Sequence, residues 1–344
     1  MRYLPIDQIQ EGMYLARNVI GNDGRVLLVK GTKLTQSYLQ KLKELDYHFL
    51  YISETPDDIE EFKGPLSDEV YTKAICTVRD SMISAAKYQS LDLQAVIDVA
   101  DFMLDEVIAE DVVYNIIELK NHSNYTYLHS VNVSVLSVLL GKALKLNQRQ
   151  LKEMVTGALL HDIGKVFIEN SILEKAGRLT PPEYEKVKRH PQYGFDLLRG
   201  HPELSLLSAH VAYQHHERAD GSGYPRGLTG DQIHYYAKIV MVADSFDAMT
   251  SGRHYREAMW SHTAIAELKA AAPEKYDPKV VSALTQVVAL YPVGSVVLLN
   301  NMEVATVCDV TSKKIRLKLL SGKNKGQRIE LSHNSKLKIE RRLS

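Results

Sequence analysis

The sequence is poor in cysteine, which limits both its covalent crosslinks and its metal chemistry. Its two cysteines, Cys76 and Cys308, lie far apart and outside any Cys-x-x-Cys spacing. This pattern excludes a disulfide framework and a zinc site built from thiolates. We therefore expect both cysteines to be reduced thiols.

The sequence also lacks a net charge and a long hydrophobic run. Its 42 basic and 42 acidic side chains balance to zero, so the whole chain has no electrostatic preference for nucleic acid or an anionic membrane. The longest apolar stretch, residues 131–140, is interrupted by Asn132 and Ser134 and is too short to span a bilayer. We expect a cytoplasmic protein with a small-molecule partner and without a nucleic-acid or membrane partner.

Three segments with different patterns divide the chain. Residues 1–66 combine short alternating stretches, glycine turns, a helical spacing of leucines at residues 39, 42 and 45, and an acidic linker, which indicates a small β-rich module. Residues 67–290 follow a helical spacing, and residues 291–344 return to short strands joined by turns. The predicted fold is therefore mainly α, a helical bundle between a small N-terminal β-rich module and a short C-terminal β segment.

Helix starts are marked inside the central segment. Thr180 precedes Glu183 by three residues, which predicts a capping box. Asp277 before Pro278 predicts the start of another helix.

Several polar residues occupy helix faces that are otherwise apolar. His129 begins an apolar stripe, and His215 and Asp244 each end one. Taken singly, such a histidine is more often a hydrogen-bonded core residue, and such an aspartate is more often a helix cap. A buried carboxylate without a partner is costly, however, so we expect Asp244 to contact a cation.

A shared metal cluster would satisfy these residues together. His161 and Asp162 directly follow an apolar helical segment, and a histidine pair precedes a glycine-rich loop. One cluster of two cations would use all the candidates, which are His129, His161, Asp162, His190, His215, His216 and Asp244. Imidazole and carboxylate ligands without thiolate suit Fe, Mn, Zn or Ni.

Four motifs in this region resemble those of the HD-GYP subfamily of HD-domain phosphodiesterases. They are "HDIGK" from His161, "HP" at His190, "HHERADGSGYPRGL" from His215 and "IVMVADSFDAMTSGRHYREA" from Ile239. The resemblance covers about residues 121–292, and the N-terminal segment resembles modules often attached to this family. It implies a helical HD domain that hydrolyses the bacterial second messenger cyclic di-GMP to pGpG, with GMP as a further product.

The resemblance implies a dinuclear metal centre. The first metal would be held by His129, His161, Asp162 and Asp244, and the second by His190, His215 and His216, with Asp162 bridging. Iron or manganese is expected, with nickel and zinc as alternatives. Two such cations lower the pKa of a bridging water and direct the resulting hydroxide at phosphorus. Family members with a third metal carry an acidic residue where this chain has Tyr125, so we expect two metals.

Beside the bridging Asp162, two residues are assigned to catalysis. Lys165 is expected to contact a non-bridging phosphate oxygen as a point charge. Asp247, one turn after Asp244, is expected to orient a metal-bound water or a ligand histidine. The alternatives are a solvated lysine at a helix end and a plain surface aspartate.

The substrate would contact the glycine-rich loop and a pair of arginines. Two guanidinium groups suit the second phosphate of a cyclic dinucleotide, although a solvated helix face explains them equally well. The loop shapes the substrate pocket in the family. The predicted substrate contacts are Lys165, Gly223, Tyr224, Pro225, Arg253 and Arg256.

Two other functions stay open at this stage. The same centre would also suit a phosphohydrolase of cyclic GMP-AMP or of another nucleotide. Glu169, Ala176 and His254 stand where prolines are common in the family, and these departures concern the loops around the substrate. The other class is a catalytically silent module that binds a dinucleotide or docks on a signalling protein, such as a diguanylate cyclase, through the Gly-Tyr-Pro loop. We also expect a homodimer.

Overall fold

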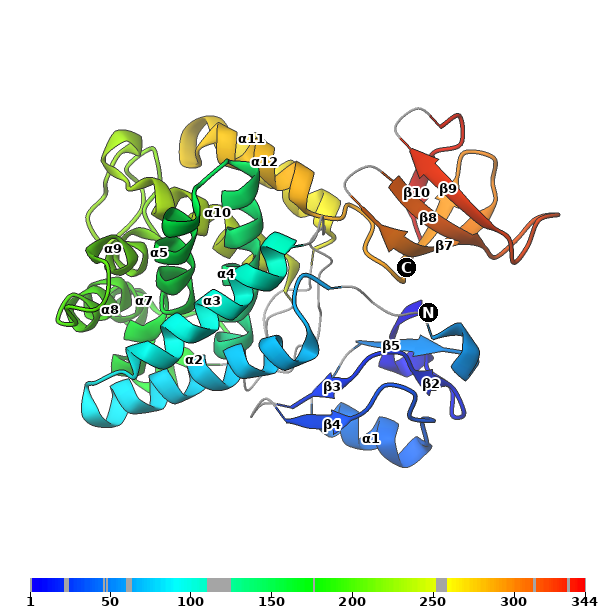
Figure 1. Cartoon of the computed structure of the whole chain (residues 1–344), viewed down its shortest axis with the longest axis horizontal. Helices are drawn as coiled ribbons and strands as arrows, with labels where there is room; N and C mark the ends of the chain where they lie inside the picture. The colour runs from blue at the N-terminus through cyan, green and yellow to red at the C-terminus, as the bar shows by residue number, and fades with distance from the viewer. Residues whose placement is uncertain are drawn as a thin grey trace. The chain divides into compact units, whose positions relative to one another are not determined.

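The computed structural model describes residues 2–21, 25–45, 47, 49–59, 64–109, 125–175, 177–251, 259–311, 314–332 and 335–343. The predicted substrate contacts Arg253 and Arg256, and the loop residues Ala176 and His254, lie outside these ranges. The chain divides into two compact units. One is helical and contains Pro65–Glu110 and Asn124–Val287, and the other combines the strands of Met1–Gly64 with those of Val288–Ser344 (Figure 1).

The helical unit is built from α-helices and short 3-10 helices, and it contains all the described candidate ligands. The elements are α2 (Asp68–Tyr88), α3 (Leu93–Ala109), α4 (Tyr125–Ala143), α5 (Gln148–Leu159), η4 (Ile163–Phe167), α6 (Asn170–Leu173), α7 (Pro181–Val187), α8 (His190–Leu198), α9 (Leu206–Gln214), η5 (Gly230–Gln232), α10 (Tyr235–Thr250), α11 (Ser261–Lys275) and α12 (Pro278–Val287). The prediction of a mainly α chain is confirmed.

Helices α4 and α10 form the centre of this unit. Every residue from 128 to 141 of α4 is buried, as expected for a helix without Asp, Glu, Lys or Arg side chains in this span and packed on several sides. Helix α4 packs against α5, α10, α12 and α2, and α5 packs against α9. His129 on α4 and Asp244 on α10 are thereby brought into the core.

Local signals start several of these helices. The N–H of Thr180 donates to Glu183 Oε2 at 2.7 Å at the start of α7, and α12 begins at Pro278, so both predicted helix starts are confirmed. Helix α5 begins with a capping box between Asn147 and Gln150. Because α5 ends at Leu159, the chain turns at His161 and Asp162 directly into η4.

A close approach of two backbones brings η4 against α8. A Cβ atom added at Gly164 would overlap the carbonyl oxygen of His190 and would lie 2.5 Å from the backbone nitrogen of Gly194. Only glycine fits at such a contact. This contact fixes the distance between Asp162, which precedes η4, and His190, which begins α8.

The other unit contains the predicted strands at both ends of the chain. Its N-terminal part has β1 (Arg2–Pro5), η1 (Ile6–Gln8), β2 (Tyr14–Leu15), β3 (Val19–Ile20), β4 (Val26–Leu28), α1 (Gln36–Glu44), β5 (Phe49–Ser53) and η2 (Pro56–Asp58). The strands form an antiparallel sheet of order β1-β5-β2 and a β3-β4 hairpin. Leu39 and Leu42 of α1 are buried, but Leu45 is 36% exposed because α1 ends at Glu44.

The C-terminal strands form one antiparallel sheet. They are β6 (Val296–Leu299), β7 (Val304–Val310), β8 (Lys314–Leu319), β9 (Arg328–Ser332) and β10 (Ile339–Arg342), in the order β10-β6-β7-β8-β9. Residues 300–301 and 321–322 lie in the connections that join β6 to β7 and β8 to β9. Across the described ranges of both units, none of the helices combines the length and the apolar character that crossing a bilayer requires.

Candidate metal centre

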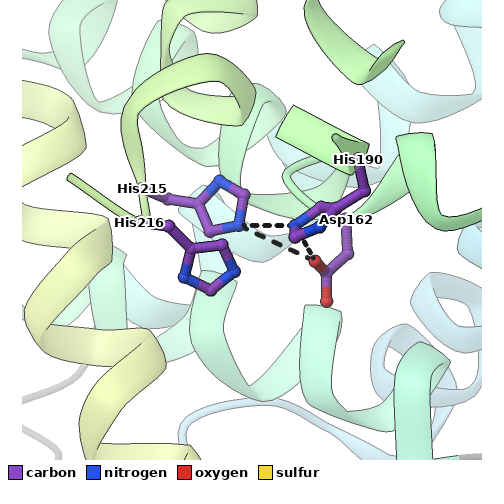
Figure 2. A group of neighbouring side chains, drawn as sticks. All are labelled: Asp162, His190, His215 and His216. Carbon is purple, nitrogen blue, oxygen red and sulfur yellow. Dashed lines mark hydrogen bonds and ion pairs between the residues drawn. The ribbon is translucent and has the colours of Figure 1, made fainter. Parts of the chain in front are cut away.

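The candidate ligands lie in two adjacent groups within the helical unit. Ligand atoms of Asp162, His190, His215 and His216 all lie within 4.8 Å of one another, and His129, His161 and Asp244 form a second such group. Figure 2 shows the first group, in which the rings of His190 and His215 and the carboxylate of Asp162 converge, with His216 beside His215. The structure therefore brings together every ligand that the sequence predicts.

Asp162 lies between the two groups. Its Oδ1 atom is 3.3 Å from His190 Nε2 and 3.7 Å from His215 Nε2. Its Oδ2 atom is 3.4 Å from His161 Nε2 and 3.9 Å from His129 Nε2. Each carboxylate oxygen thus faces one group of histidines, and the side chain itself is 1% exposed.

Three of the histidines are oriented by the backbone of their own helix ends. His161 Nδ1 donates to the carbonyl of Ala158 at 2.8 Å, His190 Nδ1 to Val187 at 2.7 Å and His215 Nδ1 to Ala212 at 2.9 Å. A carbonyl oxygen only accepts hydrogen bonds, so each Nδ1 carries the proton. The Nε2 atoms of the three rings lie 3.3, 3.4 and 3.7 Å from an oxygen of Asp162.

His129 is oriented by side chains instead. Its Nδ1 atom lies 2.8 Å from Asp247 Oδ2, and its Nε2 atom lies 3.1 Å from Asp244 Oδ1. Asp247, predicted to orient a water or a ligand histidine, therefore contacts a histidine directly. His216, which is 19% exposed, has its Nδ1 atom 3.7 Å from Asp244 Oδ2.

The donor set fits divalent cations. His190 Nε2 and His215 Nε2 face each other at 3.4 Å, although both atoms are acceptors in the neutral rings. Among the described residues, His161 Nε2 and Asp162 Oδ1 are buried without a hydrogen-bond partner. Burial lowers the pKa of His190 and lowers that of His215 to about 4. These imidazoles are therefore neutral near pH 7, as metal binding requires.

The two carboxylates are ionised. Burial acts to raise the pKa of Asp162, but the charge of Lys165 and the contacts with His161 and His190 outweigh it and hold that pKa well below its usual range. Burial also acts to raise the pKa of Asp244, but the hydrogen bond with His129 and the charges of His216 and His161 together outweigh it and hold that pKa well below its usual range. Two buried negative charges among histidines form a site that attracts cations.

Two carboxylates favour a proton on His129. Burial acts to lower the pKa of His129, but its hydrogen bonds to Asp244 and Asp247 outweigh burial and raise that pKa. Its Nε2 atom and Asp244 Oδ1 are both predicted ligand atoms. A cation bound there would therefore compete with a proton for His129 Nε2.

Lys165 contacts the carboxylate that lies between the two groups. Its Nζ atom is 2.5 Å from Asp162 Oδ2, and its side chain is 24% exposed. The ammonium group thus lies at the boundary between the buried ligands and solvent. Its predicted contact with a phosphate oxygen stays a prediction.

The Gly-Tyr-Pro loop folds back on the histidine pair. The ring of Tyr224 lies 4.8 Å from that of His216, and the N–H of Tyr224 donates to the carbonyl of His216 at 3.2 Å. A Cβ atom at Gly223 would overlap the backbone of Glu217 and Arg218. The glycine therefore permits this close return of the chain.

Sequence reasoning missed Glu217, which holds this loop. Its side chain is fully buried, and its two oxygens accept the N–H groups of Arg226 at 2.8 Å and Leu228 at 2.9 Å. The signal available in the sequence is its position directly after the histidine pair and before the glycine-rich loop. Taken alone, however, a glutamate in a charged loop predicts a solvated side chain.

Comparison with known proteins agrees with this site. A family model described as an HD domain matches residues 111–280. A cyclic di-GMP phosphodiesterase of Pseudomonas aeruginosa is 34% identical over 251 residues, which are 71% of this chain and 60% of that protein. The 3'3'-cGAMP-specific phosphodiesterase 3 of Vibrio cholerae is 37% identical over 49% of this chain and 37% of its own length. This chain therefore spans less than two thirds of the length of either relative.

A solved structure shares the fold. An HDG"Y"P protein from Bdellovibrio bacteriovorus aligns over 82% of this chain and 97% of its own, with a TM-score of 0.51 and 17% sequence identity. The HD-domain match covers all the candidate ligand residues described above. Residues 111–280 of this chain therefore belong to the HD-domain family.

Proposed function

We propose that this protein hydrolyses a cyclic dinucleotide, with cyclic di-GMP as the first candidate, at a centre of two divalent metal ions. The observation that carries the proposal is the position of Asp162, which directs one oxygen to each group of buried histidines. A carboxylate shared between two nitrogen-rich groups is the arrangement expected of a bridging ligand. The sequence relationship to a cyclic di-GMP phosphodiesterase supports the choice of substrate.

The two groups divide the ligands between the metals. One ion is assigned to His129, His161 and Asp244, and the other to His190, His215 and His216, with Asp162 shared. Ligands of this kind suit iron or manganese first, and nickel or zinc as alternatives. When bound, two such ions lower the pKa of a coordinated water and neutralise charge on a phosphoryl group.

The remaining residues act on the substrate. Lys165, beside Asp162, supplies a positive charge for a phosphate oxygen. Tyr224 offers its ring next to His216, and Gly223 and Pro225 set the course of that loop. Arg253 and Arg256 are assigned to the second phosphate from the sequence alone. The products are pGpG and, after a second hydrolysis, GMP.

A second candidate substrate is cyclic GMP-AMP. It is favoured by the 37% identity to a relative named as specific for 3'3'-cGAMP. Both dinucleotides present the same phosphodiester to the metal centre and differ in one base. The discrimination therefore depends on residues around the bases, and comparison of kcat/KM for the two substrates measures it.

Other parts of the proposal concern the whole chain. We propose three domains, residues 1–66, 67–290 and 291–344, because the pattern changes from strands to helices and back near these bounds. A cytoplasmic location, a homodimer and docking of a diguanylate cyclase at the Gly-Tyr-Pro loop belong to the same proposal. Each rests on the sequence pattern and on the family.

The test measures turnover and metal content on one sample. The full chain is purified under reducing conditions with iron or manganese, and cleavage of cyclic di-GMP and of cyclic GMP-AMP is followed beside the Asp162→Ala variant. Asp196→Ala, which removes an exposed carboxylate paired with Arg199 on the surface of the same unit, is the control. Joint loss of metal and cleavage in Asp162→Ala alone supports the proposal. A wild-type protein that holds two metals and cleaves neither dinucleotide contradicts it.

A further inference from the structure

A chain of hydrogen bonds links α2 to a candidate metal ligand. The hydroxyl of Tyr71 donates to Asn132 Oδ1 at 2.8 Å, and Asn132 Nδ2 donates to Asp247 Oδ1 at 3.3 Å. The other oxygen of Asp247 lies 2.8 Å from His129 Nδ1. All four side chains are buried, with exposed fractions of at most 4%.

We propose that Tyr71 is a positioning residue for the metal ion assigned to His129, His161 and Asp244. It acts through Asn132 and Asp247 on the ring of His129 and does not itself contact the metal or the substrate. This inference rests on the proposed function, because it requires that His129 bind a metal. Tyr71 lies on α2, Asp68–Tyr88, outside residues 111–280 that match the HD-domain model.

The direction of each hydrogen bond in the chain is fixed by its neighbours. An ionised carboxylate only accepts, so Asn132 must turn its NH2 group toward Asp247. The amide oxygen of Asn132 then faces Tyr71, which must donate to it. At the other end, Asp247 requires a proton on His129 Nδ1, which leaves the Nε2 lone pair for a metal.

The start of α2 is itself held in place, so that Tyr71 is a fixed donor. Ser67, the N-cap residue of α2, donates to both carboxylate oxygens of Glu106 on α3, through its N–H and its hydroxyl, each at 2.7 Å. The N–H of Tyr71 donates to the carbonyl of Ser67 at 3.0 Å in the first turn. The ring of Tyr71 is therefore delivered to Asn132 from an anchored helix end.

The test is the affinity of the metal-free protein for Mn²⁺ in the Tyr71→Phe variant of the full chain. The phenyl ring keeps the packing and removes only the hydroxyl. Loss of a group that orients a ligand histidine typically lowers metal affinity by about 10- to 100-fold. Because Tyr71 lies two hydrogen bonds beyond Asp247, which orients His129 directly, we expect an effect at the lower end of that range. One equivalent of Mn²⁺ should bind about tenfold more weakly, with the second equivalent unchanged.

A matched control separates positioning from general stability. Tyr236 is also a buried tyrosine of this unit, and its hydroxyl donates to Glu153 Oε2 at 3.0 Å, but Glu153 is not a candidate ligand. Tyr236→Phe is therefore expected to leave both Mn²⁺ affinities unchanged. Equal loss of affinity in the two variants overturns the inference, since it reports destabilisation alone.

A double-mutant cycle tests the route. In the Asp247→Asn background, addition of Tyr71→Phe is expected to change Mn²⁺ affinity by less than twofold, because the connection to His129 is already altered. If the two effects multiply independently, Tyr71 does not act through Asp247 and the inference is wrong. Unchanged Mn²⁺ binding in Tyr71→Phe overturns the inference but leaves the metal centre intact. A wild-type protein that binds no Mn²⁺ overturns both.

Discussion

The buried carboxylate of Glu217 allows a quantitative test of how the Gly-Tyr-Pro loop is held. It accepts two backbone N–H groups, from Arg226 and Leu228, at 2.8 and 2.9 Å. Glu217→Gln keeps the size of the side chain but replaces one acceptor oxygen by an NH2 group, which then faces a backbone donor. One buried N–H loses its acceptor, which costs about 1–3 kcal/mol. The remaining hydrogen bond loses its charge assistance and weakens. We therefore expect the free energy of unfolding to fall by about 2–4 kcal/mol.

Urea denaturation of the two proteins measures this difference. Asp220→Asn is the matched control, because Asp220 accepts the N–H of Ser222 at 2.9 Å in the same loop but is exposed. A surface change of this kind is expected to cost less than about 0.5 kcal/mol. Since Glu217 also fixes the course of the chain around Tyr224, KM for the dinucleotide should rise in Glu217→Gln. Equal stabilities of the two variants would refute the reasoning.

Three further predictions concern the residues around Asp162. Gly164→Ala forces η4 away from the carbonyl of His190. Calorimetry should show a free energy of unfolding lower by about 1–3 kcal/mol, and elemental analysis should show a lower metal content. Lys165→Gln removes the ammonium beside Asp162; kcat should drop by about 100-fold at unchanged metal content, and loss of metal instead would assign Lys165 a structural role. Burial lowers the pKa of His215 to about 4, below its value of about 6.5 in the unfolded chain, so the unfolded chain binds a proton first as pH falls. Metal-free protein should therefore lose up to about 3 kcal/mol of stability between pH 6.5 and pH 4, and His215→Gln should flatten this dependence in urea titrations.

The grouping of the candidate ligands could be predicted from the sequence because several of them carry a local signal. His161 and Asp162 end an apolar helix, and Asp244 follows an apolar stripe. Such positions put a polar group in the core, where it needs a partner. The sequence could not predict the place of Asp162 between two groups, since that depends on the contact of η4 with α8, made by residues far apart in the chain.

Residues that act at a distance left no such signal. Tyr71 occupies an ordinary buried position of α2, and only the packing of α2 on α4 reveals its hydrogen bond to Asn132. Glu217 accepts hydrogen bonds from backbone N–H groups nine and eleven residues further on. Almost every residue has such a group, so the sequence does not mark which ones Glu217 binds. The exposure of Leu45 has a similar cause, because an apolar spacing does not state the residue at which the helix ends.

The way in which the histidines are oriented decides which of them tolerate changes nearby. His161, His190 and His215 each donate to a main-chain carbonyl three residues earlier. Because every amino acid supplies that carbonyl, substitution of the residue that bears it leaves the acceptor in place. The Nδ1 atom of His129 instead contacts a side chain, the carboxylate of Asp247. Among these four histidines, His129 is therefore the one whose orientation depends on the identity of a neighbouring residue.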